Sequence, residues 1–289
     1  MKISIIAPVL NEYECIDEFI NRVQDTINRT NYENIDLIFI DDGSDQQFLN
    51  LLIENSKKYS NIKIISFKKN YGHQMAILAG YEYSYDKYDI SISIDSDLQD
   101  PPELIYDLIN IYEKNDLNIV YTIRNKNDNR SRVKYFLSNL FYSILFISNK
   151  NESLKFAGDF RLIDKTAMEY IVSNKNKIYF IRGFLFMNKN LKFKTFNFQR
   201  DQRFGGVPKY TFSKLYKLAV SGLYPYLNKY LLSNMVLIVF FGLLYVFLKI
   251  KLMKYLIITL GFLLVIIAVT KLIVFPNLNN NYEIRKIFT

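Results

Sequence analysis

Two carboxylates on alternate residues, Asp95 and Asp97, come directly after the apolar run Ile90–Ile94. A β-branched run of this kind is typical of a buried parallel strand, so both acids are expected where a strand ends. Mg²⁺ binds proteins through one or two carboxylates together with substrate phosphates, and the nearby amide of Gln99 can assist. These three residues form a candidate site for Mg²⁺ or Mn²⁺. Acids are also frequent in turns, where they form local hydrogen bonds, so the spacing alone is a weak signal.

The segments around these acids alternate between strand-like and helix-like patterns. Apolar β-branched runs predict strands, and apolar residues at helical spacing predict helices between them. This alternation is typical of an α/β fold with a doubly wound, mostly parallel sheet, whose ligands bind beyond the carboxyl ends of the strands. The expected strands are Ile3–Val9, Ile35–Ile40, Ile62–Phe67, Ile90–Ile94 and Ile119–Ile123, and the expected helices are Glu14–Ile27, Phe48–Tyr59, Gln74–Tyr85 and Pro102–Asn115.

Two long apolar stretches near the C-terminus have the length of membrane spans. Leu231–Leu248 contains no charged residue, and Tyr255–Phe275 contains a single lysine. At about 1.5 Å per helical residue, both approach the ~30 Å thickness of the hydrocarbon core. We therefore expect a C-terminal transmembrane helical hairpin over residues 231–275, with the short link Lys249–Lys254 on the far side. The lysines and arginines outside the link favour cytosolic termini.

The rest of the chain divides around this hairpin. Residues 1–209 are expected to form a cytosolic catalytic domain, since the chain begins with a strand and shows no signal peptide. Residues 210–230 mix lysines with apolar residues and are expected to form an amphipathic linker in the membrane interface. Residues 276–289 are expected to be a cytosolic tail. The predicted location is the cytoplasmic membrane, with the catalytic domain facing the cytosol.

The charge distribution bears on the partners. The chain has 37 basic and 28 acidic residues, a net charge of +9, and this excess is shared between the large domain and the C-terminal part. Such a modest, spread excess fits an anionic leaflet and an anionic phosphate substrate better than nucleic acid. The single cysteine, Cys15, excludes an internal disulfide and a Cys-based zinc site, and is expected to pack as a small apolar side chain.

Asp95 and Asp97 belong to a longer motif, Asp95-Ser-Asp-Leu-Gln-Asp-Pro-Pro-Glu103. This motif resembles the D-x-D-L-Q-D-P-P-E of the family 2 glycosyltransferases, in the branch that glycosylates polyprenyl phosphates. The branch includes bactoprenol glucosyltransferases, undecaprenyl-phosphate aminoarabinose transferases and dolichyl-phosphate mannosyltransferase. Five further segments agree in order and spacing: Pro8–Glu12, Asp41–Ser44, Asn70–Gly72 with Ala76 and Gly80, Gly158–Asp164, and Gln202–Tyr210.

The resemblance implies a GT-A type fold and a role for each matching residue. Asp97 and Asp159 would be catalytic, and Asp95, Asp97 and Gln99 would bind the metal. The nucleotide-sugar donor, with UDP as the expected nucleotide, would contact Pro8, Leu10, Glu12, Asp42, Asn70, Asp95, Ser96, Arg203 and Lys209. The acceptor phosphate of the polyprenyl lipid would contact Arg124, Arg132, Lys134 and Arg161. The expected reaction inverts the anomeric carbon, and self-association into a homo-oligomer is compatible with the sequence.

The acceptor's charge bears on the mechanism. A phosphate monoester has a second pKa of about 6, so it is already largely dianionic at neutral pH. General-base catalysis therefore matters less, and Asp159, which the family pattern makes the candidate base, can instead position an arginine or the metal. The site must mainly supply cations for the leaving diphosphate and for the acceptor.

Some residues depart from the family pattern. Gln202 replaces an acid, Pro208 replaces a serine, and the only histidine, His73, is interpreted as a surface or satisfied polar group rather than a catalyst. Three alternatives remain at this stage. A processive synthase acting on a sugar hydroxyl carries a Q-x-x-R-W element, but this chain has no tryptophan. An inactive membrane scaffold would not need the intact acids at 95 and 97, and a flippase would need more than two spans.

Overall fold

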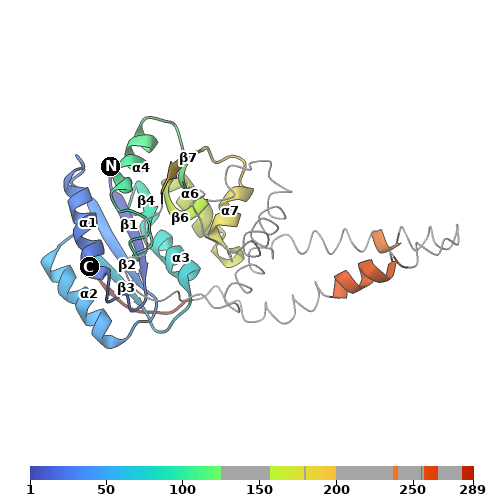
Figure 1. The fold of residues 1–289 in the computed structure, drawn as a ribbon, viewed down its shortest axis with the longest axis horizontal. Helices are drawn as coiled ribbons and strands as arrows, with labels where there is room; N and C mark the ends of the chain where they lie inside the picture. The colour runs from blue at the N-terminus through green and yellow to red at the C-terminus, as the bar shows by residue number, and fades with distance from the viewer. Residues whose placement is uncertain (125–156, 179, 200–236, 240–254, 256, 266–281) are drawn as a thin grey trace. The chain divides into compact units, whose positions relative to one another are not determined.

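The computed structural model describes residues 1–124, 157–178, 180–199, 237–239, 255, 257–265 and 282–289 (Figure 1). The chain divides into two compact units. The first comprises Met1–Lys209 together with Asn280–Thr289, and the second comprises Tyr210–Asn279. The sequence did not predict that the last ten residues belong with the first unit.

Among the described residues, the first unit is built on an eight-stranded sheet in the order β7-β5-β6-β4-β1-β2-β3-β8. Its centre consists of four parallel strands, β3-β2-β1-β4. Their apolar, β-branched residues are buried on both faces, as expected for parallel strands covered by helices. The bounds are β1 (Ile3–Val9), β2 (Ile35–Asp41), β3 (Ile62–Phe67) and β4 (Ile90–Ser93).

The outer strands change the direction of the sheet. β6 (Ala157–Asp164) runs antiparallel to both of its neighbours, β4 and β5 (Ile119–Arg124), while β7 (Phe193–Phe198) runs parallel to β5. At the opposite edge β8 (Ile284–Phe288) pairs antiparallel with β3. The predicted α/β fold with a mostly parallel sheet is confirmed, and the antiparallel strands β6 and β8 were not predicted.

Helices cover both faces of the sheet (Figure 1). One core lies between the sheet and α1, α2 and α4, and the other lies between the sheet and α3, α6 and α7. Full burial of a large apolar side chain stabilises a fold by about 1.5–3 kcal/mol, so these two layers hold the unit together. The bounds are α1 (Ile16–Asn28), α2 (Gln46–Lys58), α3 (His73–Ser84), α4 (Leu104–Glu113), α6 (Lys165–Ser173) and α7 (Ile181–Met187).

The ends of the observed helices differ from the predicted ends by one or two residues. Helix α2 begins at Gln46 rather than Phe48 because Asp45 is its N-cap, with its carboxylate accepting a hydrogen bond from the Phe48 amide at 2.9 Å. Cys15 is buried in the core, as predicted.

The described residues of the second unit, 237–239, 255 and 257–265, are helical. Several of their large apolar side chains are exposed, among them Val239, Tyr255 and Phe262. Within the described ranges, no helix combines the length and the apolar character needed to cross a bilayer. Most of the expected hairpin, including the link at 249–254, lies outside these ranges.

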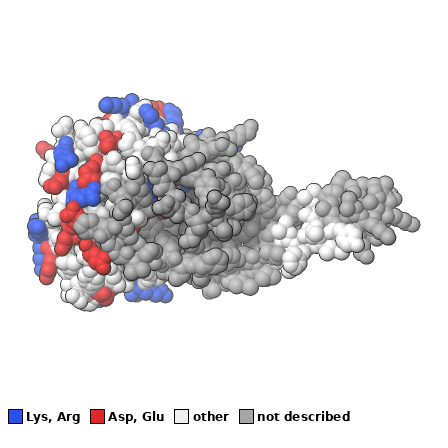
Figure 2. Space-filling model, in the orientation of Figure 1, with Lys and Arg blue, Asp and Glu red and all other residues white. Residues whose placement is uncertain are grey.

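The visible described surface of the molecule carries acidic and basic side chains interspersed with one another (Figure 2). On this face no large patch of one sign appears among the described residues. A basic stripe of the kind that tracks a nucleic-acid backbone is therefore absent from this part of the surface.

Candidate active site

The candidate site lies where the order of the parallel strands reverses. β1 has β2 on one side and β4 on the other, and open α/β sheets bind ligands at the carboxyl ends of such neighbouring strands. β1 ends at Val9, and β4 is followed by Asp95. The hydroxyl of Ser96 donates a hydrogen bond to the Pro8 carbonyl at 3.3 Å, which ties the two strand ends together.

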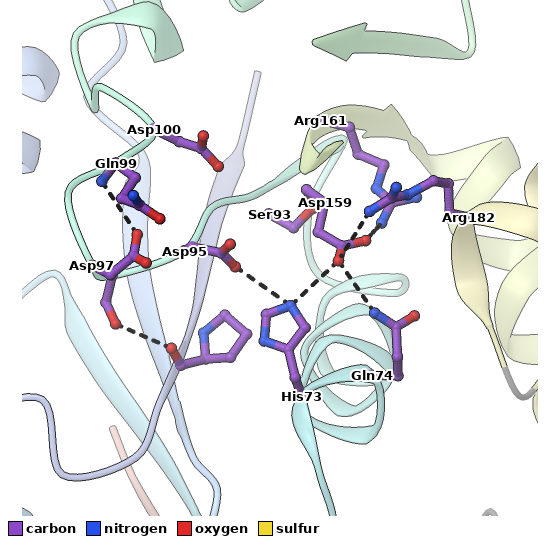
Figure 3. Close-up of polar contacts among 12 residues, drawn as sticks. His73, Gln74, Ser93, Asp95, Asp97, Gln99, Asp100, Asp159, Arg161 and Arg182 are labelled. Carbon is purple, nitrogen blue, oxygen red and sulfur yellow. Dashed lines mark hydrogen bonds and ion pairs between the residues drawn. The ribbon is translucent and has the colours of Figure 1, made fainter. Parts of the chain in front are cut away.

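A tight turn shapes the motif after β4. Leu98 has a φ of 58°, a conformation that is unusual for a bulky residue, and its side chain is buried in the core beneath the turn. The backbone amide of Gln99 donates to Asp97 Oδ1 at 3.2 Å. This anchored turn places Asp95, Asp97 and Gln99 together (Figure 3). Backbone strain of this kind persists where the surroundings fix it, often at functional sites.

Asp159, from β6, is surrounded by donors and cations (Figure 3). Arg161 Nη2 donates to its Oδ1 at 2.5 Å, and Arg182 Nη2 lies 3.4 Å from Oδ2. Gln74 Nε2 donates to the same Oδ2 at 3.3 Å, and His73 Nε2 lies 3.5 Å from it. Burial alone would raise the pKa of Asp159, but Arg182, His73 and Arg161 hold it well below its usual range. Asp159 is therefore an ionised anchor for cations.

The backbone of β6 explains how Asp159 reaches this position. The pairing of β5 with β6 shifts its register between Tyr121 and Ile123, opposite the stretch that contains Asp159. Such irregularities re-aim side chains next to active sites. The Asp159 carbonyl also accepts a hydrogen bond from the Ser93 hydroxyl at 2.5 Å, which fixes β6 against β4.

His73 lies between two acids of the site rather than on open surface. Its Nε2 is 3.4 Å from Asp95 Oδ1 and 3.5 Å from Asp159 Oδ2. Burial would lower the pKa of His73, but the two carboxylates outweigh it and raise the pKa to about 9. The sequence left two possibilities for His73, a surface group or a satisfied polar group, and these contacts with two carboxylates match the second. Helix α3 begins at this residue and points it into the site.

The turn at 95–100 concentrates negative charge. Burial raises the pKa of Asp95, and the nearby acids Asp100, Asp159 and Asp97 raise it further, against the opposing effect of His73. No group of three or more His, Cys, Asp or Glu side chains arranged as a metal site occurs among the described residues. Two carboxylates and an amide oxygen nevertheless fit a hard cation that also binds substrate phosphates. The excess negative charge at Asp95 is what such a cation would neutralise.

The candidate phosphate-binding arginines differ in exposure. Arg124, at the end of β5, has a side chain that is 23% exposed, and its Nη2 lies 3.1 Å from the fully buried carboxylate of Asp100. The side chain of Arg161 has no exposed surface and donates to Asp159. Arg161 thus contacts Asp159 in the interior, and its contact with the acceptor phosphate stays a prediction.

Within the described ranges, the predicted donor-binding residues come from β1 and from the four loops that follow β1, β2, β3 and β4. Asn11 joins two of these loops, because its amide donates to Ser44 Oγ and its side chain accepts from the Asp45 amide, both at 3.0 Å. Leu10 and Glu12, which flank it, are half-buried, and Asn70 is exposed. Pro8 is buried within β1 and Ser96 is buried beside it.

Asp42 has a structural partner of its own. Its buried carboxylate accepts from the amides of Tyr71 at 2.7 Å and Gly72 at 2.9 Å. Burial raises the pKa of Asp42 to about 6, despite these hydrogen bonds. Asp42 therefore holds the loop after β3, and its contact with the nucleotide stays a prediction. Ala76 and Gly80 pack toward the sheet rather than the donor, since a Cβ on Gly80 would lie 2.3 Å from Ile6.

Several predicted site residues lie outside the described residues, namely Arg132, Lys134, Arg203 and Lys209, together with Gln202 and Pro208. Conversely, sequence reasoning missed Gln74 and Arg182. Both reach Asp159 through tertiary contacts, from α3 and α7, so no local pattern marks them. The Gln74 carbonyl oxygen also accepts from the Ile181 amide at 3.1 Å, which connects the two helices.

Comparison with known proteins agrees with this geometry. The profile of Glycosyl transferase family 2 matches residues 4–172. The chain is 34% identical over 226 residues to the uncharacterized glycosyltransferase YkcC of Bacillus subtilis, covering 78% of this chain and 68% of that protein. It is 30% identical over 226 residues to the bactoprenol glucosyl transferase of Shigella phage SfV, covering 77% of this chain and 71% of that protein.

Among solved structures, the fold resembles glucosyl-3-phosphoglycerate synthase from Mycobacterium tuberculosis, crystallised with Mn²⁺, UDP and glucosyl-3-phosphoglycerate. The TM-score is 0.51 at 16% identity, over 77% of this chain and 78% of that one. At this identity the likeness shows a common GT-A-like fold.

Proposed function

The chain belongs to glycosyltransferase family 2, in the branch of the bactoprenol glucosyl transferases, and from this premise we propose that it transfers a sugar from a nucleotide-sugar to a polyprenyl phosphate. The product would be a lipid-linked hexose or modified sugar that serves as a donor for cell-envelope glycans. One observation carries the proposal. The acid-rich turn at 95–99 and Asp159, whose carboxylate is surrounded by cations, lie together beyond the carboxyl ends of the parallel strands.

On the donor side, UDP is the proposed nucleotide, by extension from the neighbour of similar fold that was crystallised with UDP. Leu10, Glu12 and Asn70 line the loops beyond β1 and β3 where the nucleotide would bind. Asp95, Asp97 and Gln99 would hold Mg²⁺ or Mn²⁺ against the diphosphate, and the bound ion would supply positive charge for the leaving group. The role of the chain is to fix these oxygen ligands in one rigid turn.

On the acceptor side, we assign Arg124 to the polyprenyl phosphate, because it is the partly exposed arginine at the end of β5. Arg132 and Lys134 are proposed as further contacts. The phosphate oxygen attacks the anomeric carbon in line, the bond to the diphosphate oxygen breaks, and the nucleoside diphosphate leaves. A single displacement of this kind inverts the anomeric carbon. The dianionic acceptor has no proton to lose, so the step does not require a base.

In this scheme Asp159 acts through its neighbours. Its ionised carboxylate, with a pKa well below the usual range, is a poor proton acceptor at neutral pH. It instead orients Arg182 and His73, whose charged groups lie beside it. Positioned cations of this kind stabilise charge that develops during the reaction, at no cost of reorganisation.

The proposal includes a membrane anchor. The chain leaves the catalytic unit after Lys209 and rejoins it from Asn280 onward, and β8 then pairs with β3 in the same sheet. A segment that starts and ends in one folded unit crosses a bilayer an even number of times. The two apolar stretches of residues 231–275 meet this condition as a hairpin, with residues 210–230 at the interface. The exposed apolar side chains at 239, 255 and 262 also suit a lipid environment.

Cysteine labelling in intact cells tests this anchor. In a Cys15→Ala background, a cysteine at Met253 should react with a membrane-impermeant reagent from outside, and one at Thr289 should not. Reaction of both only after lysis would instead indicate a re-entrant hairpin that does not span the membrane.

The activity itself is tested with purified full-length protein, undecaprenyl phosphate and a panel of radiolabelled nucleotide-sugars. We expect one sugar to enter the lipid fraction in the presence of Mg²⁺ or Mn²⁺ and not in excess EDTA. Growth of a polysaccharide chain would favour a processive synthase instead. Absence of transfer from every donor would favour an inactive scaffold.

A further inference from the structure

The C-terminal segment, residues 282–289, lies beside the loop that leads from β3 to α3 (Figure 1). We call residues 68–72 of that loop the donor loop, because Asn70 lies in it. The amide of Lys68 donates to the Glu283 carbonyl at 3.0 Å, and Lys68 Nζ lies 2.7 Å from Glu283 Oε2. The C-terminal segment thus continues its pairing with β3 as far as the first residue of the donor loop.

Three aromatic rings connect the C-terminal segment with the middle of the donor loop. Tyr282 stacks on Phe67 with a centroid distance of 4.9 Å and an interplanar angle of 25°. Phe67 in turn meets the edge of Tyr71 at 5.6 Å and 87°. The Tyr282 hydroxyl also donates to Glu82 Oε2 of α3 at 2.5 Å. Tyr282 therefore contacts the strand before the donor loop and the helix after it.

The other side of the donor loop is held by the turn after β2. Asp42 accepts from the amides of Tyr71 and Gly72. Gly43 has a φ of 77°, and a Cβ on it would lie 2.3 Å from the Lys69 carbonyl carbon, so the two backbones touch. Only glycine permits this approach. The donor loop is thus clamped between the turn after β2 and the C-terminal segment.

We propose that Tyr282 is a positioning residue that orders the donor loop for nucleotide binding through Phe67 and Tyr71. The inference rests on the proposed function, because it takes residues 68–72 to contact the donor. It assigns a role in donor affinity to a residue that lies after the apolar region and far along the chain from every sequence motif. Because aromatic contacts stabilise beyond simple burial, loss of the stack should leave the donor loop less ordered and weaken nucleotide binding by about three- to tenfold.

The test compares Tyr282→Ala with the wild type, as full-length proteins in the same detergent. Calorimetric titration with UDP and Mg²⁺ should show the weaker affinity in the variant. Steady-state assays should show a donor KM raised by the same factor, with kcat and the KM for undecaprenyl phosphate unchanged. A general structural defect would instead change all three constants. Tyr282→Phe keeps the ring stack and should bind UDP like the wild type.

A matched control in the same strand is Ile287→Thr, which keeps a β-branched side chain at an exposed position and should leave UDP affinity unchanged. If Tyr282→Ala melts below the assay temperature, Tyr282→Leu replaces it, since leucine keeps apolar bulk without the ring, and the same weakening is expected. Equal UDP affinity in the folded variant and the wild type would overturn the inference while leaving the proposed function intact. A wild type that binds no nucleotide would overturn both.

Discussion

The turn after β4 and the strand β6 each bring an aspartate to one centre, but their surroundings have opposite charge. The turn brings Asp95, Asp97 and Asp100 together. Burial raises the pKa of Asp95, and the carboxylates of Asp100 and Asp97 raise it further. Asp159 of β6 lies among Arg161, Arg182 and His73, which hold its pKa well below the usual range. One region has too many negative charges for its own cations, whereas the other supplies cations from the chain itself.

This difference assigns separate roles to chemically identical side chains. In the proposed reaction, the acids of the turn would receive a positive charge from outside, supplied by a divalent ion bound with the donor diphosphate. The negative charge of Asp159 is already balanced by cations of the chain. In the proposed reaction this carboxylate therefore orients the neighbouring cations rather than taking up a proton or an ion. We therefore expect the two regions to respond very differently to the same substitution of aspartate by asparagine.

The largest effect is expected for Asp97→Asn. Loss of a metal-binding charge removes several kcal/mol of stabilisation from the leaving group, so kcat should fall by about 10³-fold or more. The melting temperature should change little, because Asp97 is half-buried and forms a hydrogen bond within its own turn. Transfer to the lipid fraction gives kcat. Asp86→Asn, at an exposed position in the same unit, is the control and should retain full activity.

A smaller effect is expected for Asp159→Asn, with a loss of about 10- to 100-fold and a clearly measurable remaining rate. The variant should also melt at a lower temperature, since removal of one partner leaves the fully buried Arg161 without its counter-charge. The kcat values of the variant and of the wild type are measured at a temperature where the variant is folded. Total loss of activity, with donor binding retained, would make Asp159 an obligatory base and would remove the distinction between the two regions.

Arg124→Ala should act mainly on the acceptor. A cation that only positions the lipid phosphate contributes to ground-state binding, so the KM for undecaprenyl phosphate should rise by about tenfold with little change in kcat. Arg124→Lys keeps the charge and should fall between the alanine variant and the wild type. A raised donor KM with an unchanged acceptor KM would place Arg124 on the donor side instead.

The smallest effect concerns pH. The remaining rate of Asp159→Asn should increase a few-fold between pH ~5.5 and ~7, because the acceptor phosphate loses its second proton over this range. The rate is followed at saturating donor, and a phosphonate analogue of the acceptor with a higher second pKa should shift the rise upward. A flat profile would mean that ionisation of the acceptor does not limit the reaction.

Much of the donor half of the molecule could be predicted from the sequence. The strands β1 and β3 match their expected bounds, because a buried parallel strand is a continuous β-branched run with sharp ends. Asp95 and Asp97 follow such a run directly, so their place at the sheet edge needed no tertiary information. The family motif then supplied their chemistry.

The rest depended on contacts between distant residues. Arg182 reaches Asp159 from a seven-residue helix whose local sequence shows no charge pattern. β8 has only five residues with two adjacent charges, so it does not alternate as a half-buried strand should. The contacts of His73 could not be predicted for a similar reason, because its acidic partners come from the turn after β4 and from β6 and not from its own helix.

The most direct test of the proposed reaction compares two acceptors. Wild-type full-length protein is given the labelled donor that it uses, Mg²⁺, and either undecaprenyl phosphate or the uncharged alcohol undecaprenol. We predict a labelled, acid-labile lipid from the phosphate and none from the alcohol, because the proposed site offers cations for an ionised acceptor and no free base. Transfer to undecaprenol at a comparable rate would contradict it.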